Sequence, residues 1–164
     1  MLISKNKFDL LKTTLSESKT SLLWWASYLE SQNDIANAME YYKKANDTKN
    51  IIRLYLKENK LTDAKNIYDK TKDIDGAYLI GNYFEKNNNI KDAILYYGLS
   101  GRINQAFRLA KENQLDNDIY ALGMKAPKNT QNLIAEYFEE KNDYEKAINL
   151  YLLGSNIRKG LNLF

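Results

Sequence analysis

The chain has 164 residues, 44% of them hydrophobic, and its 24 basic and 21 acidic residues give a net charge of +3. This composition is sufficient for a folded core, and charges spread evenly along the chain argue against a nucleic-acid-binding surface. Cysteine and histidine are both absent, which excludes disulfides, thiolate nucleophiles and serine–histidine or zinc–histidine chemistry. We therefore expect a protein that is not an enzyme and has no cofactor, metal or small-molecule substrate.

Residues 1–21 are predicted to be an amino-terminal helical or linker segment, which does not resemble a secretory signal. No apolar run approaches the roughly 20 residues that span a bilayer, so we expect no direct membrane insertion. One proline and seven glycines in the whole chain favour helices over strands.

The first predicted helical hairpin begins at Trp24 with the sequence WWASYLESQNDIANAMEYY. Two further segments align with it, LIGNYFEKNNNIKDAILYY from Leu79 and LIAEYFEEKNDYEKAINLY from Leu133. The matching tyrosines Tyr28, Tyr83 and Tyr137 place the copies 55 and 54 residues apart. The chain therefore contains an internal repeat.

Each copy has a small residue and then a bulky apolar residue on its first helix, and an alanine followed by a tyrosine on its second. These are Ala26, Leu29, Ala38 and Tyr42; Gly81, Phe84, Ala93 and Tyr97; and Ala135, Phe138, Ala147 and Tyr151. Residues three or four apart share a helix face, so we expect this set to form the repeat core. Trp24 and Trp25 stand where the other copies are also apolar, and we expect both of them in the core.

The turn inside each hairpin is predicted from two polar residues. Asn33, Asn88 and Asn142 can adopt the left-handed conformation that ends a helix. The residues that follow them, Asp34, Asn89 and Asp143, are expected to cap the next helix with a side-chain oxygen.

A second, looser hairpin follows each of the first two copies. Arg53-Leu54 matches Arg108-Leu109, and Lys57-Glu58-Asn59 is aligned with Lys111-Glu112-Asn113. We predict an all-α, right-handed α-solenoid of antiparallel helix pairs, with about five and a half hairpins over residues 22–164. The apolar last half-hairpin predicts a fragment of a longer solenoid, or an end covered by a partner.

Other motifs are explained by the repeat. Asp73–Gly76 and Asp116–Asp118 hold only part of a calcium-loop ligand set and are expected to be turn or cap residues. Gly98, Gly101 and Gly123 are expected at helix ends or close-packing points. The tyrosine pairs, with basic residues between them, could stack on nucleic acid, but one tyrosine of each pair holds a core position. We expect no nucleic-acid partner.

Five charged residues recur on the predicted surface: Glu30, Glu85, Glu139, Arg53 and Arg108. The interpretation we favour is that these arginines and carboxylates pair with each other between helices. The alternative is that they form an interaction surface for a partner protein.

The repeat resembles the tetratricopeptide pattern. More narrowly, Trp24-Trp25-Ala26, Tyr28–Ser31, Ala38, Tyr41-Tyr42, Ala45 and Arg53 are similar to the helical region of the intraflagellar transport protein 140 family. Arg108–Asp116 and Ala135–Tyr151 are similar to later parts of the same region. The resemblance covers residues 22–164, and nothing before Leu22 resembles the propellers of that family.

This resemblance implies a non-catalytic scaffold of intraflagellar transport complex A, involved in retrograde transport and ciliary cargo delivery. It implies other subunits of that complex as partners, and a location in the cilium or flagellum and in the cytoplasm at the ciliary base. The alternative is a general tetratricopeptide adaptor or a vesicle-coat-type solenoid in cytoplasmic protein assembly.

Overall fold

The computed structural model describes residues 18–164, and every regular element in that range is an α-helix. Residues 1–17 of the predicted amino-terminal segment lie outside the described residues. The all-α prediction is confirmed, and within each compact unit the helices form short hairpins that pack against their neighbours in sequence. Within residues 18–164 no helix is long and apolar enough to cross a membrane. The chain divides into two compact units, before and after the boundary between Asp73 and Ile74.

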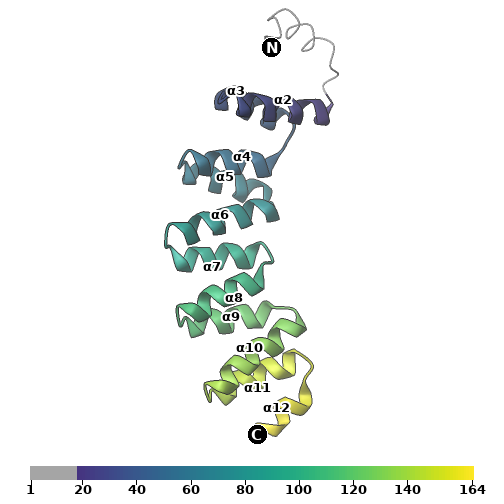
Figure 1. Cartoon of the computed structure of the whole chain (residues 1–164). Coiled ribbons are helices and arrows are strands. Elements are labelled where there is room, and N and C mark those ends of the chain that lie inside the picture. The colour runs from purple at the N-terminus through teal and green to yellow at the C-terminus, as the bar shows by residue number, and fades with distance from the viewer. Residues whose placement is uncertain (1–17) are drawn as a thin grey trace, which may run out of the picture. The chain divides into compact units, whose positions relative to one another are not determined.

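The first unit consists of four helices that form two hairpins. These are α2 (Lys19–Ser31), α3 (Ile35–Lys44), α4 (Thr48–Lys57) and α5 (Leu61–Thr71). The main packing joins α2 to α3 and α4 to α5, and α3 also contacts α4 (Figure 1). Their shared core contains Ala26, Ala38, Tyr42, Ile51 and Leu54.

The second unit is built from hairpins of the same kind. It contains α6 (Ile74–Lys86), α7 (Ile90–Leu99), α8 (Ile103–Glu112), α9 (Asp116–Lys125), α10 (Lys128–Glu140), α11 (Tyr144–Leu153) and α12 (Ile157–Asn162). The tightest pairs are α6 with α7 and α10 with α11, and each helix lies beside the next (Figure 1). The predicted first and second helices of each copy are thus adjacent partners.

Most of the described helices are joined by turns of three residues, and the middle residue of each such turn has a positive φ. These residues are Asn33, Asn46, Asn59, Asn88, Gly101, Gln114, Asn142 and Ser155. At the first of them, the amide of Asp34 donates to the carbonyl of Leu29 and that of Asn33 to Glu30. This is the Schellman pattern, which satisfies carbonyls at the end of a helix. The left-handed prediction for Asn33, Asn88 and Asn142 is confirmed.

One predicted alignment is shifted by a residue. The left-handed residue that matches Asn59 is Gln114 and not Asn113, so α4 and α8 are related by 55 positions along their whole length. Lys57 therefore corresponds to Glu112. The shared letters Lys-Glu-Asn misled the alignment, because a turn needs a left-handed residue at its centre and glutamine can also supply it.

The cap predictions hold at two of the three hairpins. Asp34 accepts from the amide of Asn37, and Asp143 from that of Lys146, at 3.3 and 3.4 Å. The prediction for Asn89 is wrong, because its side-chain amide donates to Asp92 instead, at 2.7 Å, and makes no cap hydrogen bond.

Most of the predicted repeat-core residues are buried in the structure. All of the alanines and tyrosines in the predicted core set are buried, as are Gly81, Phe84, Phe138 and Trp25, whereas Leu29 is half-buried. The prediction that Trp24 lies in the core is wrong, because its side chain is 55% exposed. Adjacent residues point about 100° apart around a helix, so only Trp25 faces the hairpin. Trp24 stacks on Tyr28 instead, with ring centroids 5.6 Å apart.

Candidate functional site

A cluster of polar side chains links the first two hairpins through Glu30, near the end of α2. Arg53 reaches it from α4, and its two terminal nitrogens donate to the two carboxylate oxygens at 2.7 and 2.6 Å. The hydroxyl of Tyr42, from α3, donates to the same carboxylate at 3.2 Å. One carboxylate thus holds the second helix of its own hairpin and the first helix of the next.

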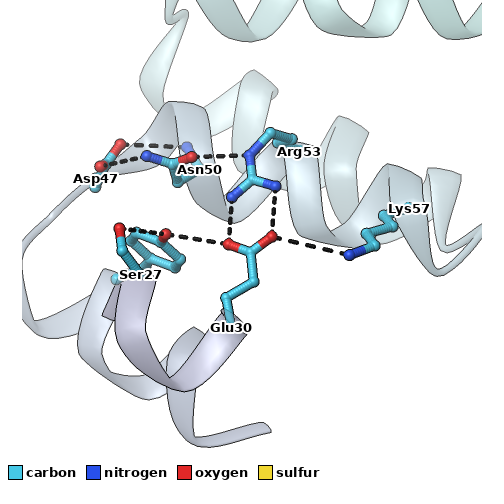
Figure 2. Close-up of polar contacts among 7 residues, drawn as sticks. Ser27, Glu30, Asp47, Asn50, Arg53 and Lys57 are labelled. Carbon is cyan, nitrogen blue, oxygen red and sulfur yellow. Dashed lines mark hydrogen bonds and ion pairs between the residues drawn. The ribbon is translucent and has the colours of Figure 1, made fainter. Parts of the chain in front are cut away.

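The guanidinium of Arg53 is held in place by a chain of hydrogen bonds on its own helix. Its Nε donates to the side-chain oxygen of Asn50 at 2.8 Å, and the side-chain Nδ2 of Asn50 donates to the carboxylate of Asp47 at 2.7 Å (Figure 2). Lys57 lies 3.9 Å from Glu30. Two-point pairing of arginine with a carboxylate fixes both groups in one geometry, which a lysine could not do.

The charges in this cluster stabilise one another. Hydrogen bonding from Arg53 is the main cause that holds the pKa of Glu30 below its ordinary value, while partial burial opposes it and Tyr42 and Lys57 add to it. The hydrogen bond with Glu30 in turn raises the pKa of Arg53. Both groups therefore stay ionised at neutral pH, and their pairing links α2 to α4.

The second copy repeats the contacts of the carboxylate with a tyrosine and an arginine, but its arginine is shared with a second carboxylate. Tyr97 donates to Glu85, and Arg108 from α8 donates to the same carboxylate at 2.9 Å. Arg108 also bonds Glu112, one turn further along its own helix, at 2.9 Å. The pKa of Glu85 is lowered, here chiefly by the hydrogen bond from Tyr97, and the pKa of Tyr97 is raised by burial and by Glu85.

The third copy keeps the tyrosine and loses the cation. Tyr151 donates to Glu139, and burial together with this contact raises the pKa of Tyr151 to about 12. The position 23 residues after Glu139, which corresponds to both arginines, holds Asn162. Within residues 18–164, Glu139 makes no ion pair.

An ion pair in the third copy lies one helical turn earlier. Lys159 donates to Glu136 at 2.8 Å, and these two residues are also 23 positions apart. Sequence reasoning missed this pair, although the shared spacing of 23 residues was the signal that could have found it. It also missed the contacts of Asp116, which accepts from Tyr137 and from Lys141, both at 2.7 Å.

The five candidate surface residues therefore form two pairs and one unpaired carboxylate, Glu139. Arg53 and Glu30 are 36% and 17% exposed, and Arg108 and Glu85 are 49% and 30% exposed, so the second pair is the more open to solvent. Among the described residues, no group of three or more acidic side chains is placed to hold a metal ion. The chemistry available in these clusters is recognition by charge and hydrogen bonding.

The comparison with known families agrees with this construction. A family model for the TPR domain of intraflagellar transport proteins 140 and 172 matches residues 1–164, the entire chain. The match extends the resemblance based on the double tryptophan and the tyrosine-rich hairpins to the full length. The chain therefore belongs to this family of intraflagellar transport TPR domains, whose tetratricopeptide-type helical repeats are a scaffold of the intraflagellar transport machinery.

Proposed function

We propose that this protein is a non-catalytic scaffold that holds other subunits of intraflagellar transport complex A, in retrograde transport and ciliary cargo delivery. The observation that carries the proposal is the family match over all 164 residues. The choice of complex A is supported by the similarity around Trp24, Trp25 and Arg53. On this proposal residues 22–164 form one repeat region that works in the cilium or flagellum and at the ciliary base.

The mechanism we propose is recognition by a preformed surface. The buried core and the ion pairs between hairpins hold the helices in register, so that exposed side chains keep fixed spacings. Solenoid proteins bind partners along extended surfaces of this kind, with many shallow contacts. The open carboxylate of Glu139 is part of the proposed surface, because no described cation occupies it.

Proximity labelling tests this function. The entire chain, fused to a biotin ligase in a ciliated cell, should label subunits of complex A at the ciliary base. The matched control is Ile80→Asp with Ile134→Asp, two fully buried positions where a charge prevents packing. This control should lose the labelling. Labelling only of vesicle-coat or chaperone components would overturn the ciliary proposal in favour of a general adaptor.

A further inference from the structure

An apolar groove lies between α7 and α9 in the second unit. It encloses about 490 Å³, a volume typical of binding sites, and its apolar lining includes Ile94, Leu95, Leu99 and Leu122. Leu95 and Leu99 are 54% and 50% exposed. They lie four residues apart, so they form one ridge along the same face of α7.

The repeat itself does not require an apolar surface here. The 55-residue spacing aligns Leu95, Gly98 and Leu99 of α7 with three polar residues of α3, namely Glu40, Lys43 and Lys44. All three of these are exposed, and α3 still packs as the second helix of its hairpin. The apolar side chains of α7 are therefore not explained by the packing of a second helix against its partners.

Gly98 keeps the groove open. A Cβ atom built at this position would meet only Leu122, at an ordinary contact distance of 3.5 Å, so the packing of α7 does not need a glycine. The third copy has a leucine, Leu152, at the same position next to the end of its helix, so the helix end does not require a glycine either. The missing side chain allows another backbone to approach the floor of the groove.

Unpaired positive charge borders the groove. Lys91 in the first turn of α7 and Lys125 in the last turn of α9 both line it, and neither forms an ion pair in the described part of the chain. Asp118 is the only acidic residue in the lining. The border therefore favours an occupant with carboxylates beside its apolar side chains.

We propose that this groove binds an amphipathic helix of a partner protein, with large apolar side chains along one face and acidic residues beside them. A helix fits because the ridge of Leu95 and Leu99 and the gap at Gly98 follow helical spacing, which suits packing of one helix on another. This inference rests on the proposed scaffold function and names the chemistry of one partner.

The test uses the entire chain and a defined probe. The probe is a fluorescein-labelled helical peptide of about four turns, with leucines at i, i+3, i+4 and i+7 and glutamates at both ends. Binding is followed by fluorescence anisotropy, and chemical-shift changes in labelled protein should map to α7 and α9. A peptide of the same composition in scrambled order is the control and should not produce these shifts.

Three variants of the groove should each weaken binding. Gly98→Leu fills it with the residue of the third copy, and Leu95→Glu with Leu99→Lys installs residues of the first copy; both should reduce affinity by about tenfold or more. Their melting temperatures should stay near that of the wild type, which separates loss of binding from loss of folding. Lys91→Glu with Lys125→Glu should weaken the acidic peptide about threefold at low salt, and strengthen a peptide with lysines in place of glutamates.

Leu153→Lys is the matched control, because Leu153 is the exposed leucine of α11 that corresponds to Leu99 and does not line the groove. It should leave the affinity unchanged. Equal loss with Leu153→Lys, or peptide binding unaffected by Gly98→Leu, would overturn the proposal. Concentration-dependent dimerisation removed by Leu95→Glu with Leu99→Lys would also overturn it, because the occupant would then be a second copy. If these variants leave the labelling of transport subunits intact, the scaffold function stands and the groove proposal fails.

Discussion

The Glu30 cluster in the first unit and the Glu139 cluster in the second differ in one component. In both, a tyrosine twelve residues after the glutamate donates to its carboxylate from the other helix of the same hairpin. Only Glu30 also receives an arginine from the next hairpin. The tyrosine–glutamate contact therefore belongs to the hairpin, whereas the cation belongs to the junction between hairpins and varies from copy to copy.

The Glu85 cluster is intermediate between these two. Its arginine is shared between Glu85 and Glu112, whereas Arg53 gives both terminal nitrogens to Glu30 alone. A shared, exposed cation binds each carboxylate less tightly than a dedicated one. The strength of the junctions in the two units can thus be compared through single substitutions.

The largest expected effect is that of Arg53→Ala. It leaves the partly buried carboxylate of Glu30 with Tyr42 as its main partner, so the free energy of unfolding should fall by about 2 kcal/mol. Arg108→Ala should cost about 1 kcal/mol or less, because that pair is more exposed. Urea unfolding followed by circular dichroism measures both, and hydrogen exchange at α4 and α8 assigns each loss to its junction. Equal losses would contradict the proposed ranking.

Tyr151 provides a test of the contact within the hairpin at alkaline pH. Its pKa of about 12 in the folded protein lies above the ordinary value of about 10. Its contribution to stability is therefore fully present below pH ~10 and lost as the pH rises through about 12. The phenolate absorbance should show a late component that Tyr151→Phe reduces, and Glu139→Gln should move the Tyr151 contribution to lower pH. A late component unchanged by Glu139→Gln would show that burial alone raises this pKa.

The pKa values of Glu30 and Glu85 are expected to respond in opposite order to loss of the arginine and loss of the tyrosine. Arg53 is the main cause of the lowered pKa at Glu30, whereas Tyr97 is the main cause at Glu85. Arg53→Ala should therefore raise the pKa of Glu30 more than Arg108→Ala raises that of Glu85. The corresponding tyrosine-to-phenylalanine changes should show the opposite order. Carboxyl chemical shifts followed by NMR against pH measure all four shifts.

The sign of this effect on stability follows from the direction of the shifts. Both glutamates have pKa values below those of the unfolded chain, so their contribution is present above the ordinary glutamate pKa. It is lost as the pH falls through the lowered values. The acid sensitivity of the wild type should decrease in Glu30→Gln, which has no proton to gain.

The smallest expected effect comes from building the missing pair. Asn162→Arg places an arginine 23 residues after Glu139, as in the other two copies. It should stabilise the protein by about 0.5 kcal/mol, the value typical of a partly exposed ion pair. The gain should vanish in the double variant Asn162→Arg with Glu139→Gln. A gain that survives Glu139→Gln would mean that the arginine acts elsewhere.

Much of the fold could be predicted from the sequence because each hairpin is defined by local signals. Asparagine at a left-handed position recurs at fixed spacing and indicates the end of a helix. Small residues paired with aromatic ones also recur at fixed spacing and indicate the buried face of a helix. Trp24 was mispredicted because a position that is apolar in every copy need not be buried. Its counterpart Leu133 is also 47% exposed.

The candidate site was less predictable than the fold. Arg53 and Arg108 could be matched to their glutamates because both partners recur unchanged. The Lys159–Glu136 pair has only the 23-residue spacing as its signal, because both residues differ from their counterparts in the other copies. Gly98 was predicted to be a helix end or a close-packing point; it lies next to the last residue of α7, and a Cβ there would make only an ordinary contact. Absence of a packing partner is visible only in three dimensions.

Within each unit, the packing of helices against their sequence neighbours has a consequence for folding kinetics. The principal contacts in both units join helices at most two apart along the chain, so little loop entropy is lost before a contact forms. Such a chain should fold in microseconds to milliseconds and start from any one of several hairpins. A newly made segment could therefore become structured during its own synthesis, before later hairpins have left the ribosome.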